Sequence, residues 1–232
     1  MHRFDAVLFD NGGTLFHKPA APPVIVALAA TLGRTLDDEE GVAAWGAVKA
    51  AKRAITDQAL VFSRNRSAEG HRRYYTTCYA PLDEIADGLA DAFYRALKTS
   101  PESMIPYPDT TAVLARLHEA GVPVGVVSNT DWNIRQGYER SGLDRFISTY
   151  VLSFEHGTAK PEPEMWRLAC AELDVDPAGV LMVGNNAYAD TGIVAIGGTA
   201  LILPPVERGE RRGLSAVLGL AGIDEPAAVP AA

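Results

Sequence analysis

Short apolar runs that end at glycine, proline or polar residues recur along the chain. They cover residues 4–9, 123–127, 150–154, 180–183 and 199–203. A short apolar run bounded by turn-forming residues predicts a strand. Because these runs are almost continuously apolar, we expect strands that are covered on both faces, as in a parallel sheet.

Helical periodicity separates the later runs. Residues 110–120 place Val113, Leu114 and Leu117 on one helical face, and residues 164–173 carry a similar pattern. Alternation of strands and helices predicts an α/β fold in which a Rossmann-like parallel sheet is layered between helices.

The segment from residue 19 to residue 103 has a different character. It is rich in alanine, follows the helical period and contains no clear strand. Two apolar helical faces are predicted, made by Trp45, Val48, Ile55 and Ala59 and by Ile85, Leu89, Ala92, Phe93 and Ala96. We therefore expect an all-helical cap domain inserted after the first strand.

These patterns predict a division of the chain into domains. Residues 1–18 and 104–223 would form the α/β core, and residues 19–103 the helical cap. The last residues, 224–232, include two prolines and have little to bury, so we expect a disordered tail.

The composition and net charge of the chain restrict the kinds of molecule that we expect it to bind. The chain has 232 residues, with 21 Lys and Arg against 29 Asp and Glu, a formal net charge of −8. An acidic chain is a poor binder of nucleic acid, and no apolar stretch approaches the ~20 residues of a membrane span. Cys78 and Cys170 lie too far apart for a metal or redox motif, so we expect free thiols in a cytoplasmic protein.

Polar side chains follow the predicted strands. Asp10 comes after the first, Ser128 after the second, Lys160 after the third, and Asn185 with Asp190 after the fourth. Because the carboxyl ends of parallel strands meet at one edge of a sheet, we expect these side chains to converge there.

Four motifs now resemble those of the haloacid dehalogenase-like hydrolases. They are Phe-Asp-Asn-Gly-Gly-Thr-Leu at residues 9–15, Val-Ser-Asn at 127–129, Lys-Pro-Glu-Pro at 160–163, and Gly-Asn-Asn at 184–186 with Asp190. They match in order and spacing over roughly residues 4–205, and the helical insert resembles the C1-type cap of that superfamily.

The resemblance implies a phosphatase of a small phosphorylated metabolite, acting as a monomer or homodimer. Asp10 would be the nucleophile that forms an aspartyl-phosphate, with Lys160 as its catalytic partner. Gly13, Ser128, the backbone of Asn129 and Lys160 would bind the phosphate. A Mg²⁺ cofactor would be held by Asp10, Gly12, Asn185 and Asp190.

Two positions depart from the family pattern. Gly12 stands where most phosphatases of the superfamily have a second Asp as general acid and base, and Asn185 stands where most have a metal-binding Asp. An amide oxygen can still bind Mg²⁺, but with one negative charge fewer. His17 is the candidate that would replace the missing acid, because histidine titrates near neutral pH.

The departures leave two alternatives open. One is a catalytically weakened binding or regulatory protein on the same fold. The other is a metal-independent 2-haloacid dehalogenase, although such enzymes usually have Tyr at the position of Gly12. A dehalogenase would also use a cap arginine against the substrate carboxylate, and the candidates are Arg53, Arg64, Arg66, Arg72 and Arg73.

Overall fold

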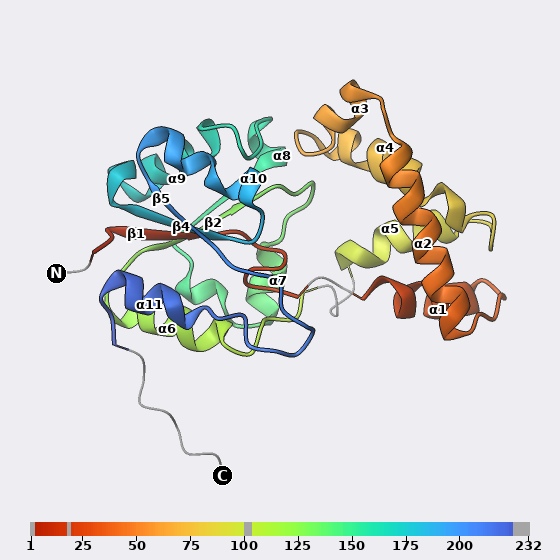
Figure 1. The fold of residues 1–232 in the computed structure, drawn as a ribbon, viewed down its shortest axis with the longest axis horizontal. Coiled ribbons are helices and arrows are strands. Elements are labelled where there is room, and N and C mark those ends of the chain that lie inside the picture. Colours follow the sequence, from red (N-terminus) through yellow and green to blue (C-terminus); the bar gives the residue numbers. More distant parts are fainter. Residues whose placement is uncertain (1–2, 18–19, 100–103, 225–232) are drawn as a thin grey trace, which may run out of the picture. The chain divides into compact units, whose positions relative to one another are not determined.

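The computed structural model describes residues 3–17, 20–99 and 104–224. They fall into two compact units, one within Met1–His17 and Ile105–Ala232 and the other within Lys18–Met104 (Figure 1). The expected disordered tail beyond Asp224 lies outside the described residues.

The first unit is built on five parallel strands in the order β3-β2-β1-β4-β5. The strands are β1 Ala6–Phe9, β2 Val124–Ser128, β3 Thr149–Leu152, β4 Val180–Gly184 and β5 Thr199–Ile202. Val7 of the central strand pairs with Val124 on one side and Leu181 on the other. The predicted α/β class, with a Rossmann-like sheet and a separate helical part, is confirmed.

Helices cover both faces of this sheet, which is why β1, β2 and β4 are buried along their whole length. Ala6 and Leu8 point toward Met165 and Trp166 of helix α9 (Glu164–Leu173). Since side chains alternate along a strand, Val7 and Phe9 point to the opposite face.

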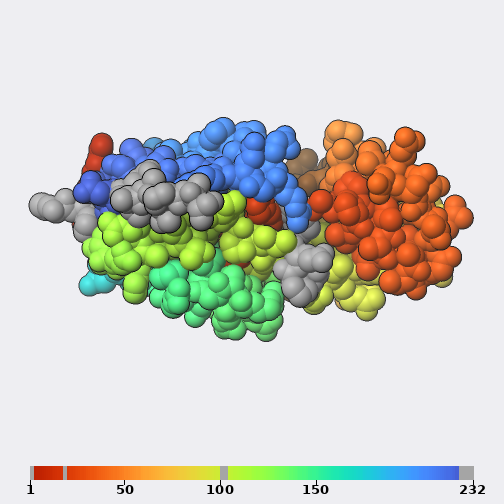
Figure 2. Space-filling model, turned by 90° about the horizontal axis from the view of Figure 1, so that it is seen from below, coloured from red at the N-terminus to blue at the C-terminus, as the bar shows by residue number. Residues whose placement is uncertain are grey.

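Helices α6 (Thr110–Glu119) and α11 (Ser215–Ala221) contact each other on that opposite side. In Figure 2 both helices reach the surface, α6 in yellow-green and α11 in dark blue. The remaining helices of the unit are short: α7 Arg135–Arg140, η3 Asp144–Phe146, α8 Ser153–His156, η4 Pro177–Gly179, α10 Ala187–Asp190 and η5 Thr191–Ile196.

The strand expected at residues 150–154 ends earlier than predicted. β3 stops at Leu152, the last residue paired with β2, and Ser153 begins the short helix α8. The Ser153 hydroxyl donates to the Thr130 carbonyl and accepts from the Thr130 amide, at 2.9 and 3.0 Å. The Ser153 side chain thus bonds to the backbone after β2, in place of the backbone hydrogen bonds that a further residue of β3 would have made.

The second unit is entirely helical over its described residues. Its helices are α1 Ala21–Thr31, α2 Asp38–Ala54, α3 Gln58–Ser63, α4 Ala68–Tyr79, η1 Ala80–Leu82 and α5 Leu89–Thr99. Its core is formed by side chains such as Ile25, Val48, Leu82 and Phe93, each at most 1% exposed. The unit therefore has its own hydrophobic core.

The first predicted apolar face is wrong in its extent. Helix α2 ends at Ala54, and Ile55 is extended. Asp57 then starts a new helix, because its carboxylate accepts from the amides of Ala59 and Leu60. Ala59 is consequently on a different helix and exposed. Ile85, assigned to the second face, lies before α5 in the turn after η1.

The two chain segments next to the unit boundary are paired inside the first unit. The His17 amide donates to the Ile105 carbonyl at 2.8 Å, and the Tyr107 amide donates to Leu15 at 3.1 Å. The Thr110 hydroxyl also binds the Leu15 carbonyl. The loop after β1 is thus fixed to the segment that leads into α6. No described helix has the length and apolar composition to cross a membrane.

Candidate active site

The expected side chains converge at the carboxyl edge of the sheet. Asp10 follows β1 and Asn185 follows β4, and these neighbouring strands flank the point where the strand order reverses. Ser128 ends β2 on the other side of β1. Crevices at such a reversal are where open parallel sheets bind their ligands.

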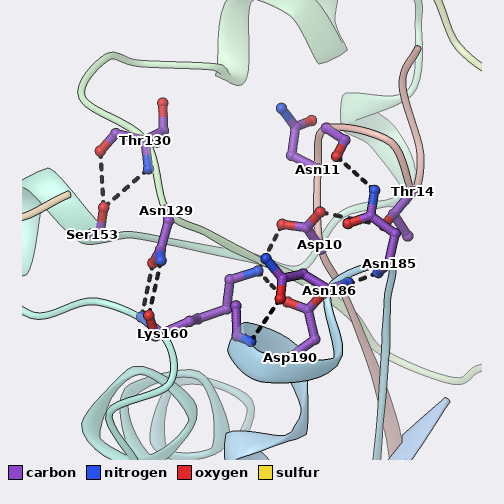
Figure 3. A network of polar contacts seen from close by, with 12 residues as sticks. Asp10, Asn11, Thr14, Asn129, Thr130, Ser153, Lys160, Asn185, Asn186 and Asp190 are labelled. Carbon is purple, nitrogen blue, oxygen red and sulfur yellow. Dashed lines mark hydrogen bonds and ion pairs between the residues drawn. The ribbon is translucent and has the colours of Figure 1, made fainter. Parts of the chain in front are cut away.

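Lys160 forms the centre of the cluster (Figure 3). Its ammonium nitrogen lies 2.7 Å from Oδ1 of Asp10 and 2.7 Å from Oδ1 of Asp190. The Lys160 and Asp190 side chains are 2% and 1% exposed, whereas that of Asp10 is 14% exposed. Asp10 is therefore the member of the trio that solvent can reach.

The charge state of Lys160 follows from this arrangement. Burial by itself lowers the pKa of the ammonium group, but the carboxylates of Asp10 and Asp190 raise it, and the net shift is upward. Lys160 thus stays protonated at neutral pH and presents a fixed positive charge beside Asp10.

Asp190 is held from both sides. Its second oxygen, Oδ2, accepts from the amides of Asn185 and Asn186, at 3.0 and 2.9 Å. The amide of Asn186 thereby joins the start of α10 to its end, and the Asn186 side chain caps the same helix. Both oxygens of Asp190 are thus engaged, one with Lys160 and the other with the loop after β4, and its predicted contact with a metal stays a prediction.

Asn129 is turned toward Lys160. Its Oδ1 accepts from the Lys160 amide at 2.8 Å, and its Nδ2 donates to the Lys160 carbonyl at 3.0 Å. The neighbouring Ser128 is 4% exposed, and its hydroxyl makes no hydrogen bond to another residue of the described part. Of these two side chains, only that of Ser128 keeps its polar group uncommitted. The phosphate contact predicted for Asn129 is through its backbone, which these two side-chain hydrogen bonds do not involve.

The loop after β1 wraps tightly around its own backbone. The carbonyl of Asn11 accepts from the amides of Thr14, Leu15 and Phe16. Gly13 has φ of +84°, a conformation that glycine adopts at no steric cost. Thr14 donates its hydroxyl to Oδ2 of Asp10 at 3.3 Å. Thr14 stands in the first motif, but no role was predicted for it from the sequence.

Gly12 leaves open space at the position of the missing second carboxylate. A Cβ built on Gly12 meets no atom within 4 Å, and its φ lies outside the left-handed region. The backbone there can accommodate a side chain, so the absence of an acid is a feature of the sequence and is not imposed by the fold.

The oxygen donors beside Asp10 fit Mg²⁺. The Asn185 Nδ2 donates to the Gly12 carbonyl at 3.1 Å, which brings this amide next to that carbonyl. A half-turn of the amide about the Cβ–Cγ bond exchanges Nδ2 and Oδ1 and leaves two neutral oxygens together near the Asp10 carboxylate. Mg²⁺ prefers such oxygen ligands and keeps several waters. The described residues include no group of three or more His, Cys, Asp or Glu that could hold a metal, so these neutral oxygens matter.

His17 has surroundings of its own. Its ring lies 3.8 Å from the ring of Tyr107, centroid to centroid, and the residue is 8% exposed. Burial and, secondly, the charge of Arg208 lower its pKa. In the described part, its ring makes no hydrogen bond to Asp10, Thr14 or Lys160. Its role as a substitute acid stays a prediction.

Two buried residues escaped the sequence analysis. Tyr138, fully buried in α7, donates its hydroxyl to Oδ1 of Asn11 at 3.0 Å, and burial raises its pKa well above the usual value. Arg212, 2% exposed, donates to the Gly13 carbonyl at 2.7 Å. Neither stands in a motif or at a strand end, so no sequence signal would have found them.

The cap arginines make contacts inside the second unit. Arg64 donates to the Tyr74 hydroxyl at 3.2 Å, Arg66 donates to the Phe62 carbonyl, and Arg72 pairs with Asp91. Arg53 and Arg73 are exposed. None of these contacts singles out one arginine for a substrate carboxylate.

Comparison with known proteins identifies the class. A family model of haloacid dehalogenase-like hydrolases matches residues 4–192, and the chain belongs to this family. The resemblance of the four motifs is thereby confirmed.

The chain is similar to individual members with different activities. It is 29% identical over 220 residues to ribulose-1,5-bisphosphate 5-phosphatase of Halopiger xanaduensis, covering 88% of this chain and 87% of that protein. It is 30% identical over 135 residues to (S)-2-haloacid dehalogenase 4A of Burkholderia cepacia, covering 58% of this chain and 51% of the dehalogenase. The solved HAD-hydrolase YfnB of Bacillus subtilis shares the fold, with a TM-score of 0.71, 17% identity, and 95% of this chain and all of that chain covered.

Proposed function

We propose that the protein is a phosphatase that acts on a small phosphate ester through an aspartyl-phosphate. The observation that carries the proposal is the contact of a buried, protonated Lys160 with Asp10, the carboxylate of the trio that solvent reaches. A carboxylate beside a fixed ammonium, at the carboxyl edge of the sheet, can accept a phosphoryl group whose charge the lysine offsets.

In the first step, an oxygen of Asp10 attacks phosphorus, and the bond between phosphorus and the ester oxygen breaks. Lys160 neutralises the charge on the non-bridging oxygens and the uncommitted hydroxyl of Ser128 binds them, whereas the Gly13 amide already donates to the Phe16 carbonyl at 2.7 Å. In the second step, water attacks the phosphorus of the aspartyl-phosphate, releasing phosphate and regenerating Asp10. Phosphoryl transfer depends mostly on positioning and charge neutralisation, which these residues supply.

The ester oxygen that leaves needs a proton unless it is already a good leaving group. Gly12 has no side chain that could donate this proton, so we infer that His17, the substrate or water donates it. General acid–base catalysis typically raises a reaction rate by ~10²–10⁴-fold. We therefore expect hydrolysis of esters with poor leaving groups to be slower by a factor of that size.

Mg²⁺ would be held by Asp10, the Gly12 carbonyl and the Asn185 amide oxygen. When bound, it would offset the repulsion between the Asp10 carboxylate and the phosphate. Asp190 would support the site from behind by keeping Lys160 in place.

The relatives support this choice. The ribulose-1,5-bisphosphate 5-phosphatase matches nearly the whole length of both chains, whereas the chain spans about half of the dehalogenase. Gly12, which carries no side chain, also favours a phosphatase over a dehalogenase with its usual bulky Tyr.

Turnover of p-nitrophenyl phosphate with Mg²⁺ tests the proposal. Wild type should release p-nitrophenol, and Asp10→Asn should abolish this activity. Asp5→Asn is the matched control, because Asp5 precedes β1 as Asp10 follows it and is exposed. Near-wild-type turnover by pure Asp10→Asn protein would exclude Asp10 as the nucleophile.

A metal-independent dehalogenase is the second candidate. It is favoured by the full engagement of both Asp190 oxygens and by the lack, in the described residues, of a cluster of acidic or histidine ligands. Halide release from 2-chloropropionate in the presence of EDTA would select it. A protein that turns over neither substrate class while binding phosphate would be the regulatory alternative.

A further inference from the structure

Arg212 is a buried cation whose side-chain hydrogen bonds, among the described residues, all go to backbone carbonyls. Its Nε donates to Gly13 at 2.7 Å, Nη1 to Pro204 at 2.5 Å and Nη2 to Leu203 at 3.2 Å. One side chain therefore joins the loop after β1 to the loop after β5, two segments about 190 residues apart in the sequence.

The backbone of Arg212 is itself fixed. The carboxylate of Asp109, 2% exposed, accepts from the amides of Arg212 and Gly213 at 2.8 Å and from that of Leu214 at 2.9 Å. The Tyr107 ring lies 5.7 Å from the guanidinium carbon. Because both its main chain and its side chain are held, Arg212 has little freedom to follow a moving loop.

The carbonyl that Arg212 binds lies at a sensitive point. Gly13 has a left-handed backbone, and the same peptide unit carries the amide of Thr14, which donates to Asn11. Thr14 in turn donates its hydroxyl to Asp10. Fixing the Gly13 carbonyl therefore fixes the plane of the peptide that leads into the side chain touching Asp10.

We propose that Arg212 is a positioning residue that sets the orientation of the Gly13–Thr14 peptide and, through Thr14, of Asp10. The proposal rests on the proposed function, in which Asp10 is the nucleophile. Leaving a charge buried is costly, and a guanidinium satisfied by three carbonyls also gives up the pairing with a carboxylate that buried arginines usually have.

The test compares Arg212→Met and Arg212→Lys with Arg135→Met. Arg135 is the matched control, because it also joins two segments of the same unit, through Glu155 and the Tyr150 carbonyl, but its side chain has no hydrogen bond or ion pair to residues 10–16 in the described part of the chain. Two measurements are made on the full chain: kcat and KM for p-nitrophenyl phosphate with Mg²⁺, and hydrogen exchange of backbone amides by mass spectrometry.

We expect the kcat of Arg212→Met to fall about tenfold or more with KM nearly unchanged. Small misplacements of reacting groups lower the rate by up to about 10²-fold. The kcat of Arg212→Lys should lie between those of Arg212→Met and wild type. Lysine keeps the positive charge but lacks the several fixed donors of the guanidinium group. Hydrogen exchange of the backbone amides in Arg212→Met should be faster than in wild type at residues 13–16 and unchanged in β4. Arg135→Met should leave kcat within about twofold of wild type at a temperature where both fold.

Three outcomes overturn the proposal. One is an unchanged kcat in Arg212→Met, and another is an equal loss of kcat in Arg135→Met. The third is unchanged exchange in residues 13–16. If wild type has no phosphatase activity, the proposed function fails, and hydrogen exchange alone still decides whether Arg212 orders this loop. If Arg212→Met does not fold, Arg212→Lys provides the same comparison.

Discussion

The side-chain amide of Asn129 and the backbone of Lys160 form two reciprocal hydrogen bonds, at 2.8 and 3.0 Å. Asn129 follows β2, whereas Lys160 lies in the segment after α8, so the pair joins the ends of two neighbouring strands. The backbone of Lys160 is fixed by one residue and its ammonium by Asp10 and Asp190. Lys160, whose positive charge the proposed chemistry needs, is therefore fixed both at its backbone and at its ammonium group.

Asn129→Ala should reduce turnover of p-nitrophenyl phosphate by about tenfold or more, because the freed Lys160 backbone loses its alignment with Asp10. Asn133→Ala is the control, since this exposed residue also makes two hydrogen bonds, both to Arg135 outside the site. Steady-state kinetics of the two variants decide the matter. Equal activity in both would show that the Asn129 pair does not govern catalysis.

Lys160→Met should lower the free energy of unfolding by about 3–5 kcal/mol, because Asp190 is left as an unpaired buried charge. Adding Asp190→Asn should recover part of the loss. Asp176→Asn, which removes an exposed carboxylate elsewhere, should recover none. Urea unfolding measures all three proteins. The raised pKa of Lys160 means that this stabilisation is complete at neutral pH and is lost only as pH rises through that value.

Gly12→Asp should fold normally, because the position is open and unstrained. The new carboxyl group can protonate a leaving oxygen, so hydrolysis of alkyl phosphates should rise relative to that of aryl phosphates. The ratio of the two kcat/KM values is the measurement, and Gly12→Asn is a control of similar size without an acid. A ratio that changes equally in both variants would contradict the proposed role of the missing acid.

Asn185→Asp should make the protein more responsive to Mg²⁺. In EDTA the new carboxylate faces the Gly12 carbonyl in place of the donating Nδ2, so the unfolding midpoint should fall. With Mg²⁺ the added charge should strengthen binding and raise the midpoint more than in wild type. Asn186→Asp controls for charge, since it keeps the cap of α10. Calorimetric Mg²⁺ affinity that is unchanged or weaker in Asn185→Asp would remove Asn185 from the metal site.

His17 should make stability depend on pH in a defined direction. Burial and Arg208 lower its pKa in the folded state, so the unfolded state binds more protons. Stability is therefore greatest above the ordinary value of about 6.5 and falls as pH drops through the lowered value. His17→Phe, which retains an aromatic ring against Tyr107, should flatten thermal unfolding midpoints between pH 7.5 and 5. His156→Gln, at an exposed position, should not.

Apolar patterning and the order of the polar residues along the chain were enough to predict the architecture and the main ionic cluster. Continuous apolar runs are required by strands buried on both faces, and parallel strands bring their carboxyl ends to one edge. The convergence of Asp10, Lys160 and Asp190 was predictable for that reason. The motifs likewise predicted membership of the hydrolase family, because order and spacing are properties of the chain.

The pairing of individual polar groups, by contrast, depends on the folded chain. Asn129 carries an amide equally suited to a phosphate or to a peptide, and the fold places the Lys160 backbone against it. Next to the ends of α2 and β3, Asp57 and Ser153 each make two side-chain hydrogen bonds, and apolar periodicity does not record such bonds. Arg212 stands in a run of charged loop residues like any solvated arginine. It becomes a buried contact of Gly13 only because folding brings together segments almost the whole chain apart, and local sequence carries no trace of such long-range contacts.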